Sequence, residues 1–196
     1  SVRKHISRLL PNGQPDQVFH DANNQPNGRI SGIALQPDGK ILISGNFYRV
    51  GSSNRNRIAR LMPWGDVDSN YSAAFNEGIW DDPYTVVSRL QLSADGKLYA
   101  LGHFRDVNGS ARQYLVRLEA DGDLDSEFDP QLNSYALSLV VEDDGDLVVG
   151  GVFSQARGVS RSGMVRYEGE GAVSELSVPA VGEVVWVRDG ACPELS

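Results

Sequence analysis

Three aspartates at alternate positions, Asp121, Asp123 and Asp125, have the spacing with which a calcium loop begins. A hard cation needs several oxygen ligands within a short turn, and alternate carboxylates supply them. The helix-loop-helix calcium pattern would continue with glycine at position 126 and glutamate at position 132, where this chain has Ser126 and Leu132. We therefore expect a structural turn at these aspartates, with calcium binding as the alternative.

The other residue types that carry catalysis or bind metals do not form a recognisable site. His5, His20 and His103 are not spaced like zinc ligands. The serines in residues 158–163 lack the Gly-x-Ser-x-Gly arrangement of a hydrolase nucleophile. Cys192 is the only cysteine, which excludes an internal disulfide and a cysteine-based zinc site. We expect a protein that is not an enzyme and has no cofactor, calcium apart.

Two loops of variable length combine polar and aromatic side chains that suit a glycan or protein ligand. Aromatic rings stack on sugar faces, while carboxylates and amides bind hydroxyl groups. The alternative is that Trp80 and Tyr84 are buried and hold their loop against the fold. The candidate ligand-binding residues are Trp80, Asp81, Asp82 and Tyr84 in residues 72–85, and His20, Asn23 and Asn24 in residues 20–29.

A repeated sequence unit must position these loops. Its most regular phrase places an arginine between apolar residues, as in Ile58 to Leu61, and each arginine is followed by a glycine five residues later. A second phrase runs from Asp-Gly to Gly-x-Phe in residues 38–47, 95–104 and 144–153. The arginines of the first phrase, at spacings of 52, 57 and 49 residues, are Arg8, Arg60, Arg117 and Arg166. Repeats of this length indicate a modular architecture.

Each unit has the pattern of β-strands. Apolar residues alternate or form short runs on both sides of Asp-Gly, the dipeptide of tight hairpins. We expect three strands per unit and a short fourth strand near residues 16–19, 68–71 and 125–128. The predicted fold is all-β, with antiparallel propeller-like blades of about 50 residues in a partial or small ring. Residues 1–171 would contain about three full blades and a leftover N-terminal strand, and residues 172–196 a degenerate last repeat and the start of a linker.

The repeated arginines are predicted to be structural. A guanidinium group bonds a carboxylate and a backbone carbonyl in one plane, which suits holding a turn inside a blade. An aspartate stands eight residues after three of the arginines, but Ser174 takes that place after Arg166. The predicted clamp residues are Arg8, Arg60, Arg117 and Arg166 with Asp16, Asp68 and Asp125. Phe47, Phe104 and Phe153 are expected in the core between neighbouring blades.

The repeat resembles a known family. Residues 36–47, with the run Asp-Gly-Lys-Ile-Leu-Ile-Ser-Gly-Asn-Phe, and residues 117–128 are similar to the delta-60 repeat of large bacterial secreted and surface proteins. The resemblance implies a β-propeller-like fold and an extracellular setting, and it brings no catalytic residue or ligand. We expect a non-enzymatic module for structural, protein or glycan contact. The alternative is a fragment of a propeller hydrolase or lyase whose catalytic residues lie outside this chain.

Charge limits the partners. The chain has 18 Lys and Arg against 26 Asp and Glu, a net charge of −8, which disfavours nucleic acid and anionic lipid surfaces. The apolar runs are much shorter than the roughly 20 residues of a membrane-spanning helix. Open blade edges would expose unpaired backbone groups. We therefore expect them to be covered by a neighbouring domain or by a second copy of the chain.

Overall fold

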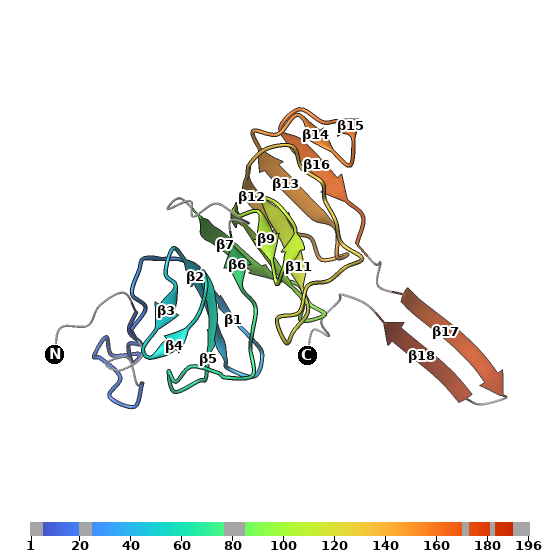
Figure 1. Ribbon diagram of the computed structural model, residues 1–196. Coiled ribbons are helices and arrows are strands. Elements are labelled where there is room, and N and C mark those ends of the chain that lie inside the picture. Colours follow the sequence, from blue (N-terminus) through green and yellow to red (C-terminus); the bar gives the residue numbers. More distant parts are fainter. Residues whose placement is uncertain (1–5, 20–24, 77–84, 170–172, 181–182, 190–196) are drawn as a thin grey trace.

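The computed structural model shows an all-β chain that confirms the predicted fold class (Figure 1). It describes residues 6–19, 25–76, 85–169, 173–180 and 183–189, the last two ranges through their backbone only. The described residues contain no helix, and accordingly none that could cross a membrane.

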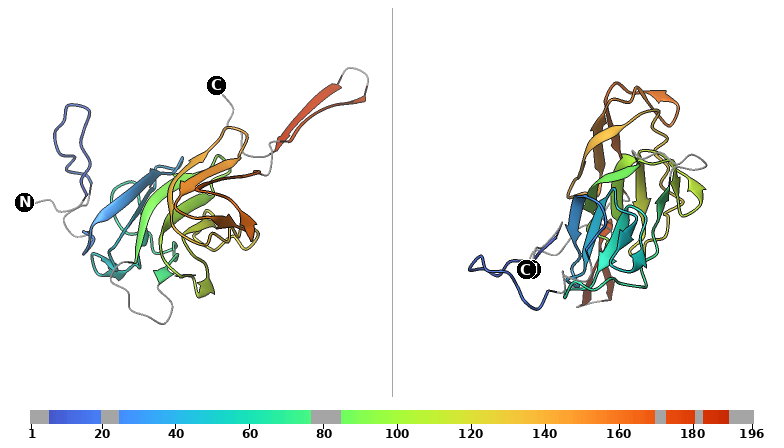
Figure 2. Two further views of the ribbon diagram at one scale, coloured as in Figure 1. Left: turned by 90° about the horizontal axis from the view of Figure 1, so that it is seen from above. Right: turned by 60° about the vertical axis from the view of Figure 1, so that its left-hand side comes forward.

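Three antiparallel sheets of three strands follow one another along the chain, and we call them the first, second and third blade. The first blade contains β1 (Ile30–Leu35), β2 (Ile41–Gly45) and β5 (Ile58–Leu61), the second β7 (Val86–Leu92), β8 (Leu98–His103) and β11 (Leu115–Leu118), and the third β12 (Ala136–Val141), β13 (Leu147–Gly151) and β16 (Met164–Tyr167). In each blade the second strand lies in the middle. The blades lie side by side, as the two views of Figure 2 also show.

The Asp-Gly turns join the first two strands of each blade as predicted. Gly39, Gly96 and Gly145 all have positive φ angles, of 82°, 85° and 87°, which glycine adopts without steric cost. In the first turn the carboxylate of Asp38 accepts a hydrogen bond from the amide of Lys40 at 3.1 Å. The turn thereby fixes the register in all three blades, with residues 35, 92 and 141 opposite 41, 98 and 147.

The predicted fourth strand was wrong in its position. At residues 68–70 and 125–127 the chain turns instead, because the carboxylates of Asp68 and Asp125 bind the amides of Asn70 and Glu127. Next to β5 and β11 the chain forms single bridges just before the predicted position, Leu61 with Val67 and Leu118 with Leu124. Short hairpins that the sequence analysis did not identify form small sheets of their own. These are β3 (Arg49–Val50) with β4 (Ser53–Asn54), β9 (Asp106–Val107) with β10 (Ser110–Ala111) and β6 (Phe75–Asn76), and β14 (Gln155–Ala156) with β15 (Val159–Ser160).

Each blade has two apolar faces, one toward the preceding segment and one toward the following blade; we call these the N-side face and the C-side face. In β2, Ile41 and Ile43 pack on the N-terminal segment, while Leu42 packs on the second blade. In β8, Leu98 packs on the first blade and Tyr99 on the third. The middle strands are therefore apolar at successive positions, as expected for strands that are covered on both faces.

Phe104 and Phe153 fill the core between blades, and Phe47 fills the core between the first blade and the N-terminal segment. Phe47 and Phe104 are fully buried, and Phe153 is 2% exposed. Phe104 meets Phe75 edge to face, with 4.8 Å between ring centres. Such pairs contribute about 1 kcal/mol beyond the burial of their apolar area.

A separate hairpin follows the third blade. It consists of β17 (Val173–Ala180) and β18 (Glu183–Asp189), and it extends away from the blades in Figure 1. The three blades and this hairpin do not form a closed ring in the described part of the chain. The division of the chain at residue 171 stays a prediction.

Candidate functional site

The loop residues predicted to bind a ligand lie outside the described residues. They are His20, Asn23, Asn24, Trp80, Asp81, Asp82 and Tyr84. Their proposed contact with a glycan or a protein therefore stays a prediction.

The predicted clamps are brought together in three of the four repeats. In each, the guanidinium Nε donates to the aspartate Oδ2, and the backbone amide of that aspartate binds the carbonyl of the arginine. The Nε–Oδ2 distances are 2.8 Å for Arg8–Asp16, 2.9 Å for Arg60–Asp68 and 2.6 Å for Arg117–Asp125. The last two pairs are buried.

Two of these arginines, Arg8 and Arg60, also connect their own unit to the following blade. The Nη1 atom of Arg60 donates to the carbonyl of Ala120 in the second blade at 2.6 Å. Arg8 makes the equivalent bond to the carbonyl of Pro63 in the first blade at 2.5 Å. Both carbonyls stand three residues after the arginine of their own repeat, so the clamp stabilises a turn and fixes the spacing between blades.

Asp125 takes part in this structural arrangement through both of its carboxylate oxygens, and calcium binding at Asp121, Asp123 and Asp125 stays a prediction. Its Oδ2 accepts from Arg117 and, at 2.8 Å, from Lys97, while its Oδ1 accepts from the amide of Glu127. Burial raises the pKa of Asp125, but the hydrogen bonds from Lys97 and Arg117 outweigh burial and lower the pKa to about 2. Asp121 accepts from the amide of Asp123 at 3.0 Å, which is the predicted turn.

The fourth clamp is rearranged. Arg166 has no aspartate eight residues later, and its Nε instead lies 2.8 Å from Oδ2 of Asp146. Asp146 occupies the repeat position of Lys40 and Lys97, the lysines that accompany the earlier clamps. In this repeat the carboxylate partner of the arginine stands at the lysine position instead of eight residues after the arginine, and it still forms an ion pair with Arg166.

Asp146 belongs to the one group of carboxylates in the described residues that has the spacing of a metal site. Ligand atoms of Glu142, Asp144 and Asp146 lie within 4.8 Å of one another. The guanidinium of Arg166 bonds all three, with its Nη2 at 2.7 Å from Glu142 and 3.3 Å from Asp144. Arg166 therefore supplies the positive charge that this cluster needs.

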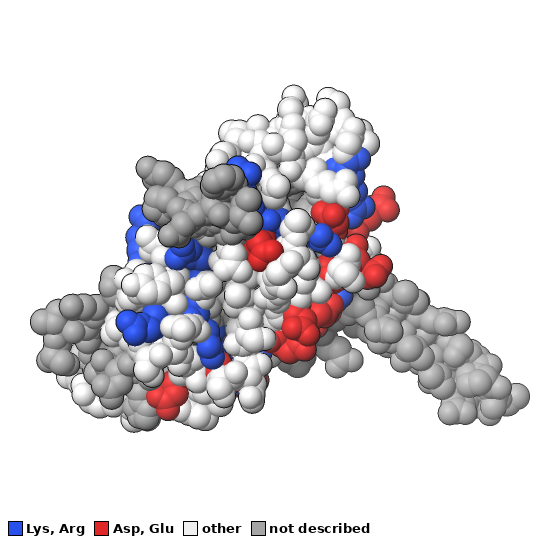
Figure 3. All heavy atoms as spheres, in the orientation of Figure 1, with Lys and Arg blue, Asp and Glu red and all other residues white. Residues whose placement is uncertain are grey.

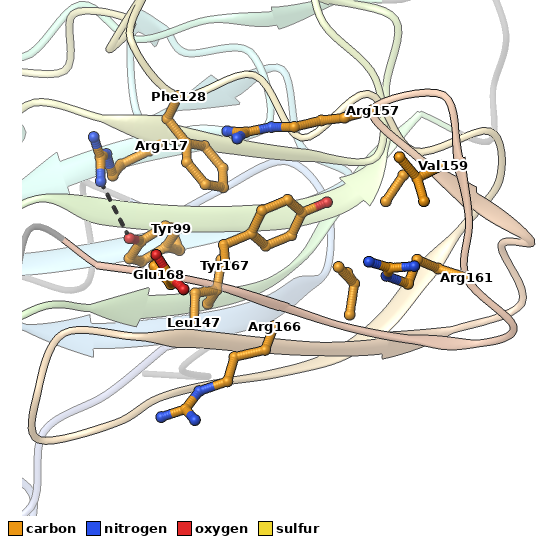
Figure 4. A pocket seen from close by; sticks show the side chains of 12 residues that line it. Tyr99, Arg117, Phe128, Leu147, Arg157, Val159, Arg161, Arg166, Tyr167 and Glu168 are labelled. Carbon is orange, nitrogen blue, oxygen red and sulfur yellow. Dashed lines mark hydrogen bonds between the residues drawn. The ribbon is translucent and has the colours of Figure 1, made fainter.

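A pocket of about 460 Å³ lies where the second and third blades meet (Figure 4). It is lined by Tyr99, Arg117, Phe128, Leu147, Ala156, Arg157, Val159, Arg161, Val165, Arg166, Tyr167 and Glu168. Four of these residues are arginines and three are aromatic. Figure 3 shows basic side chains along one edge of the third blade, with acidic side chains below them.

Arg157 takes an unusual backbone conformation at this pocket. Its φ is 47°, in the left-handed region where residues other than glycine and asparagine are strained. The first two blades have Gly51 and Asn108 at the same repeat position. The guanidinium carbon of Arg157 lies 5.3 Å from the ring centre of Tyr167, and its Nε donates to the carbonyl of Asp129 at 3.0 Å. Backbone strain of this kind is common at functional sites.

The aromatic side of the pocket is rigid. The ring of Phe128 meets the rings of Tyr99 and Tyr167 edge to face, at 5.4 and 5.6 Å between centres. The hydroxyl of Tyr167 donates to the carbonyl of Pro130 at 3.0 Å. Burial raises the pKa of Tyr167 to about 12, so this phenol stays neutral and keeps its donor proton at physiological pH.

The guanidinium groups that line the pocket make it suitable for a negatively charged ligand. Arg157 and Arg161 extend from the outer hairpin of the third blade toward the pocket, whereas Arg166 points away (Figure 4). Glu168 is the only carboxylate in the described lining, which also holds no histidine, serine or cysteine. The described lining therefore lacks a carboxylate pair or a nucleophile with its base.

Sequence analysis did not identify this site. Arg157 and Arg161 lie in a part of the repeat that does not vary in length, whereas the predicted ligand-binding residues lie in the loops that do. One signal was available, because Arg157 interrupts a position that is glycine or asparagine in the other repeats. Its neighbour Arg161 gave no signal, since Arg55 and Arg112 occupy its position in the first two blades.

Comparison with protein families identifies the repeat. A model described as "Domain of unknown function (DUF5122) beta-propeller" matches residues 36–71, 93–128 and 142–173. These three matches cover more than half of the chain, which belongs to this family; the resemblance to the delta-60 repeat is confirmed. Comparisons with curated proteins and with solved structures gave no match.

Proposed function

We propose that this chain is a non-enzymatic, extracellular binding module whose ligand is an acidic glycan. The observation that carries the proposal is the pocket between the second and third blades, in which guanidinium groups stand beside aromatic rings. A guanidinium group binds a carboxylate or sulfate through two parallel hydrogen bonds, and an aromatic ring packs against the apolar face of a sugar. The extracellular setting rests on the resemblance to delta-60 repeats of bacterial surface proteins.

A structural explanation of the arginines accounts for only some of them. Arg117 belongs to a buried clamp and Arg166 to the carboxylate cluster. Arg161 donates one hydrogen bond, to the carbonyl of Ser160 next to it in the chain. A guanidinium group has five N–H donors, so the others can bind further partners. Arg157 takes the same positive-φ conformation as Gly51 and Asn108, and for arginine that conformation is strained. A ligand would use the donors of Arg161 and those donors of Arg157 that remain beside its bond to the carbonyl of Asp129.

The experiment is calorimetric titration with oligosaccharides that contain uronic acids or sulfate groups, beside neutral oligosaccharides of the same length. We expect binding of the acidic sugars alone, and binding that weakens as salt is added. Arg157→Asn places at this position the residue that the second blade uses, so it removes the guanidinium and relieves the strain. It should weaken binding at least tenfold and leave the melting temperature unchanged or higher.

Arg112→Gln is the matched control for Arg161→Gln. Arg112 stands at the same repeat position in the second blade and donates to the preceding carbonyl in the same way, but it does not line the pocket. Arg161→Gln should weaken binding, and Arg112→Gln should not. Equal binding of neutral and acidic sugars, no binding of either, or equal effects of the two substitutions would overturn the proposal.

A further inference from the structure

The C-side face of the third blade lacks the cover that the same face has on the other two blades. Ile58 in the first blade and Leu115 in the second are fully buried, whereas Met164, at the same repeat position, is 67% exposed. Val140 lies in the same face and is 57% exposed, while Ala34, its counterpart, packs against the second blade. The C-side face of the third blade therefore has the apolar residues of a blade interface, but no following blade covers them.

The strand register shows that these residues form one surface. Val140 is paired with Val148, Val148 with Arg166, and Gly150 with Met164. The same pairing in the first blade joins Ala34, Leu42 and Arg60, and it joins Ser44 with Ile58. In the first blade these residues hold the second blade in place. The third blade thus repeats an interface that is complete elsewhere in the same molecule.

We propose that the β17–β18 hairpin docks on the C-side face of the third blade as the first two strands of a further blade. In the arrangement of Figure 1 the hairpin stands clear of that face. Its connection and its sequence both indicate where it belongs. The first two strands of each blade form an antiparallel hairpin, and β17 and β18 have the same pairing.

The sequence of β18 is that of a middle strand. It contains four successive apolar residues, Val184 to Val187. Similar runs occur in β2, which is buried against the N-terminal segment and the second blade, and in β8, which is buried against the first and third blades. A strand with one face in water alternates polar and apolar residues instead. Continuous apolar sequence in β18 is therefore explained by cover on both of its faces, one of which the third blade supplies.

The connection is short enough to favour docking within one chain. Five residues, 168–172, join the end of β16 to the start of β17. At about 3.4 Å per residue they reach at most roughly 20 Å, against about 10 Å between packed sheets. So short a tether gives a high effective concentration of the hairpin at the third blade. Docking of the same hairpin from a second copy would compete poorly at low protein concentration.

The experiment uses Trp186 in β18 as a reporter. The chain has three tryptophans, and the Trp64→Phe and Trp80→Phe substitutions leave Trp186 alone. We expect its fluorescence to be blue-shifted and poorly quenched by acrylamide. Met164→Lys should shift the emission to the red and raise quenching severalfold. Ile33→Lys is the control, because Ile33 is 57% exposed in the first blade, and it should change nothing.

Each result decides the proposal. Circular dichroism checks that the blades stay folded, and Val140→Lys serves as a second variant should Met164→Lys unfold. A fully quenched Trp186 in the parent, or equal effects of Met164→Lys and Ile33→Lys, would overturn docking on this face. A signal that is lost on hundredfold dilution would also overturn it, because the hairpin would then come from a second copy. A signal that is independent of concentration and sensitive only to the C-side face supports it.

Discussion

Asp125→Asn tests the clamp at the point where three interactions meet. The substitution keeps the shape of the side chain and an oxygen that can still accept from the amide of Glu127. It removes the negative charge that Arg117 and Lys97 share through Oδ2, at 2.6 and 2.8 Å. Arg117 would then lose its carboxylate partner at a site where Asp125 is only 3% exposed, while Lys97 would keep Glu119 at 3.2 Å.

The pKa of Asp125 gives the size of the effect. Its fall from 3.8 to about 2 corresponds to about 2.4 kcal/mol, because each pH unit is worth about 1.36 kcal/mol. Removing one partner of a buried pair costs about 3–5 kcal/mol, and the remaining oxygen of asparagine offsets part of that cost. We expect Asp125→Asn to lower the free energy of unfolding by about 2–3 kcal/mol at pH 7.

The dependence on pH distinguishes lost charge from lost packing. A carboxyl group whose pKa is lowered by folding contributes stability above the unfolded value of 3.8, and that stability disappears as pH falls toward about 2. Urea unfolding of the parent and of Asp125→Asn across this pH range should show the difference between their free energies of unfolding falling to near zero. Asp123→Asn, at an exposed neighbour, should stay within about 0.5 kcal/mol of the parent. A difference that is constant with pH, or below about 0.5 kcal/mol at pH 7, would refute the assignment.

Two further predictions concern the turn glycines and the rearranged clamp. Gly122→Ala should lower the free energy of unfolding by about 2–4 kcal/mol, because φ is +100° and the new methyl group would lie 2.9 Å from the ring of Tyr71. Gly109→Ala is the control: φ is +81° but the space is open, so the loss in thermal or urea unfolding should be only about 1–2 kcal/mol. Asp146→Lys should cost about 1 kcal/mol in urea unfolding by placing a second cation beside Arg166, which is half exposed; a variant as stable as the parent would contradict the rearranged clamp.

The regular part of the fold could be predicted because each element has a local signal. Asp-Gly marks every turn between the first two strands, and the fixed distance from Arg60 to Asp68 and from Arg117 to Asp125 predicts the pairs that the structure brings together. The predicted fourth strand failed for a local reason as well. Asp68 and Asp125 have side chains that bind a backbone amide two residues on, and that bond competes with strand formation.

The pocket could not be predicted in the same way. Tyr99 and Arg117 reach it from the second blade, and Arg157 and Tyr167 from the third, so the site exists only once the blades are packed. The sequence separation of these residues carries no periodic signal. Arg166 differs, because the 20 residues that separate it from Asp146 are a repeat spacing, the same that separates Arg60 from Lys40 and Arg117 from Lys97.

Departures from the repeat are the most informative positions in this chain. A position that is alike in all units is explained by the shared fold, as the phenylalanines between blades are. The third blade differs at Asp146, at Arg157 and at the exposed Met164. Asp146 pairs with Arg166, and the guanidinium of Arg157 packs on the ring of Tyr167. Met164 has no such partner in the arrangement seen here, and it remains apolar. Exposure of an apolar residue at a position that elsewhere forms the interface between blades is the reason to look for a docked hairpin there.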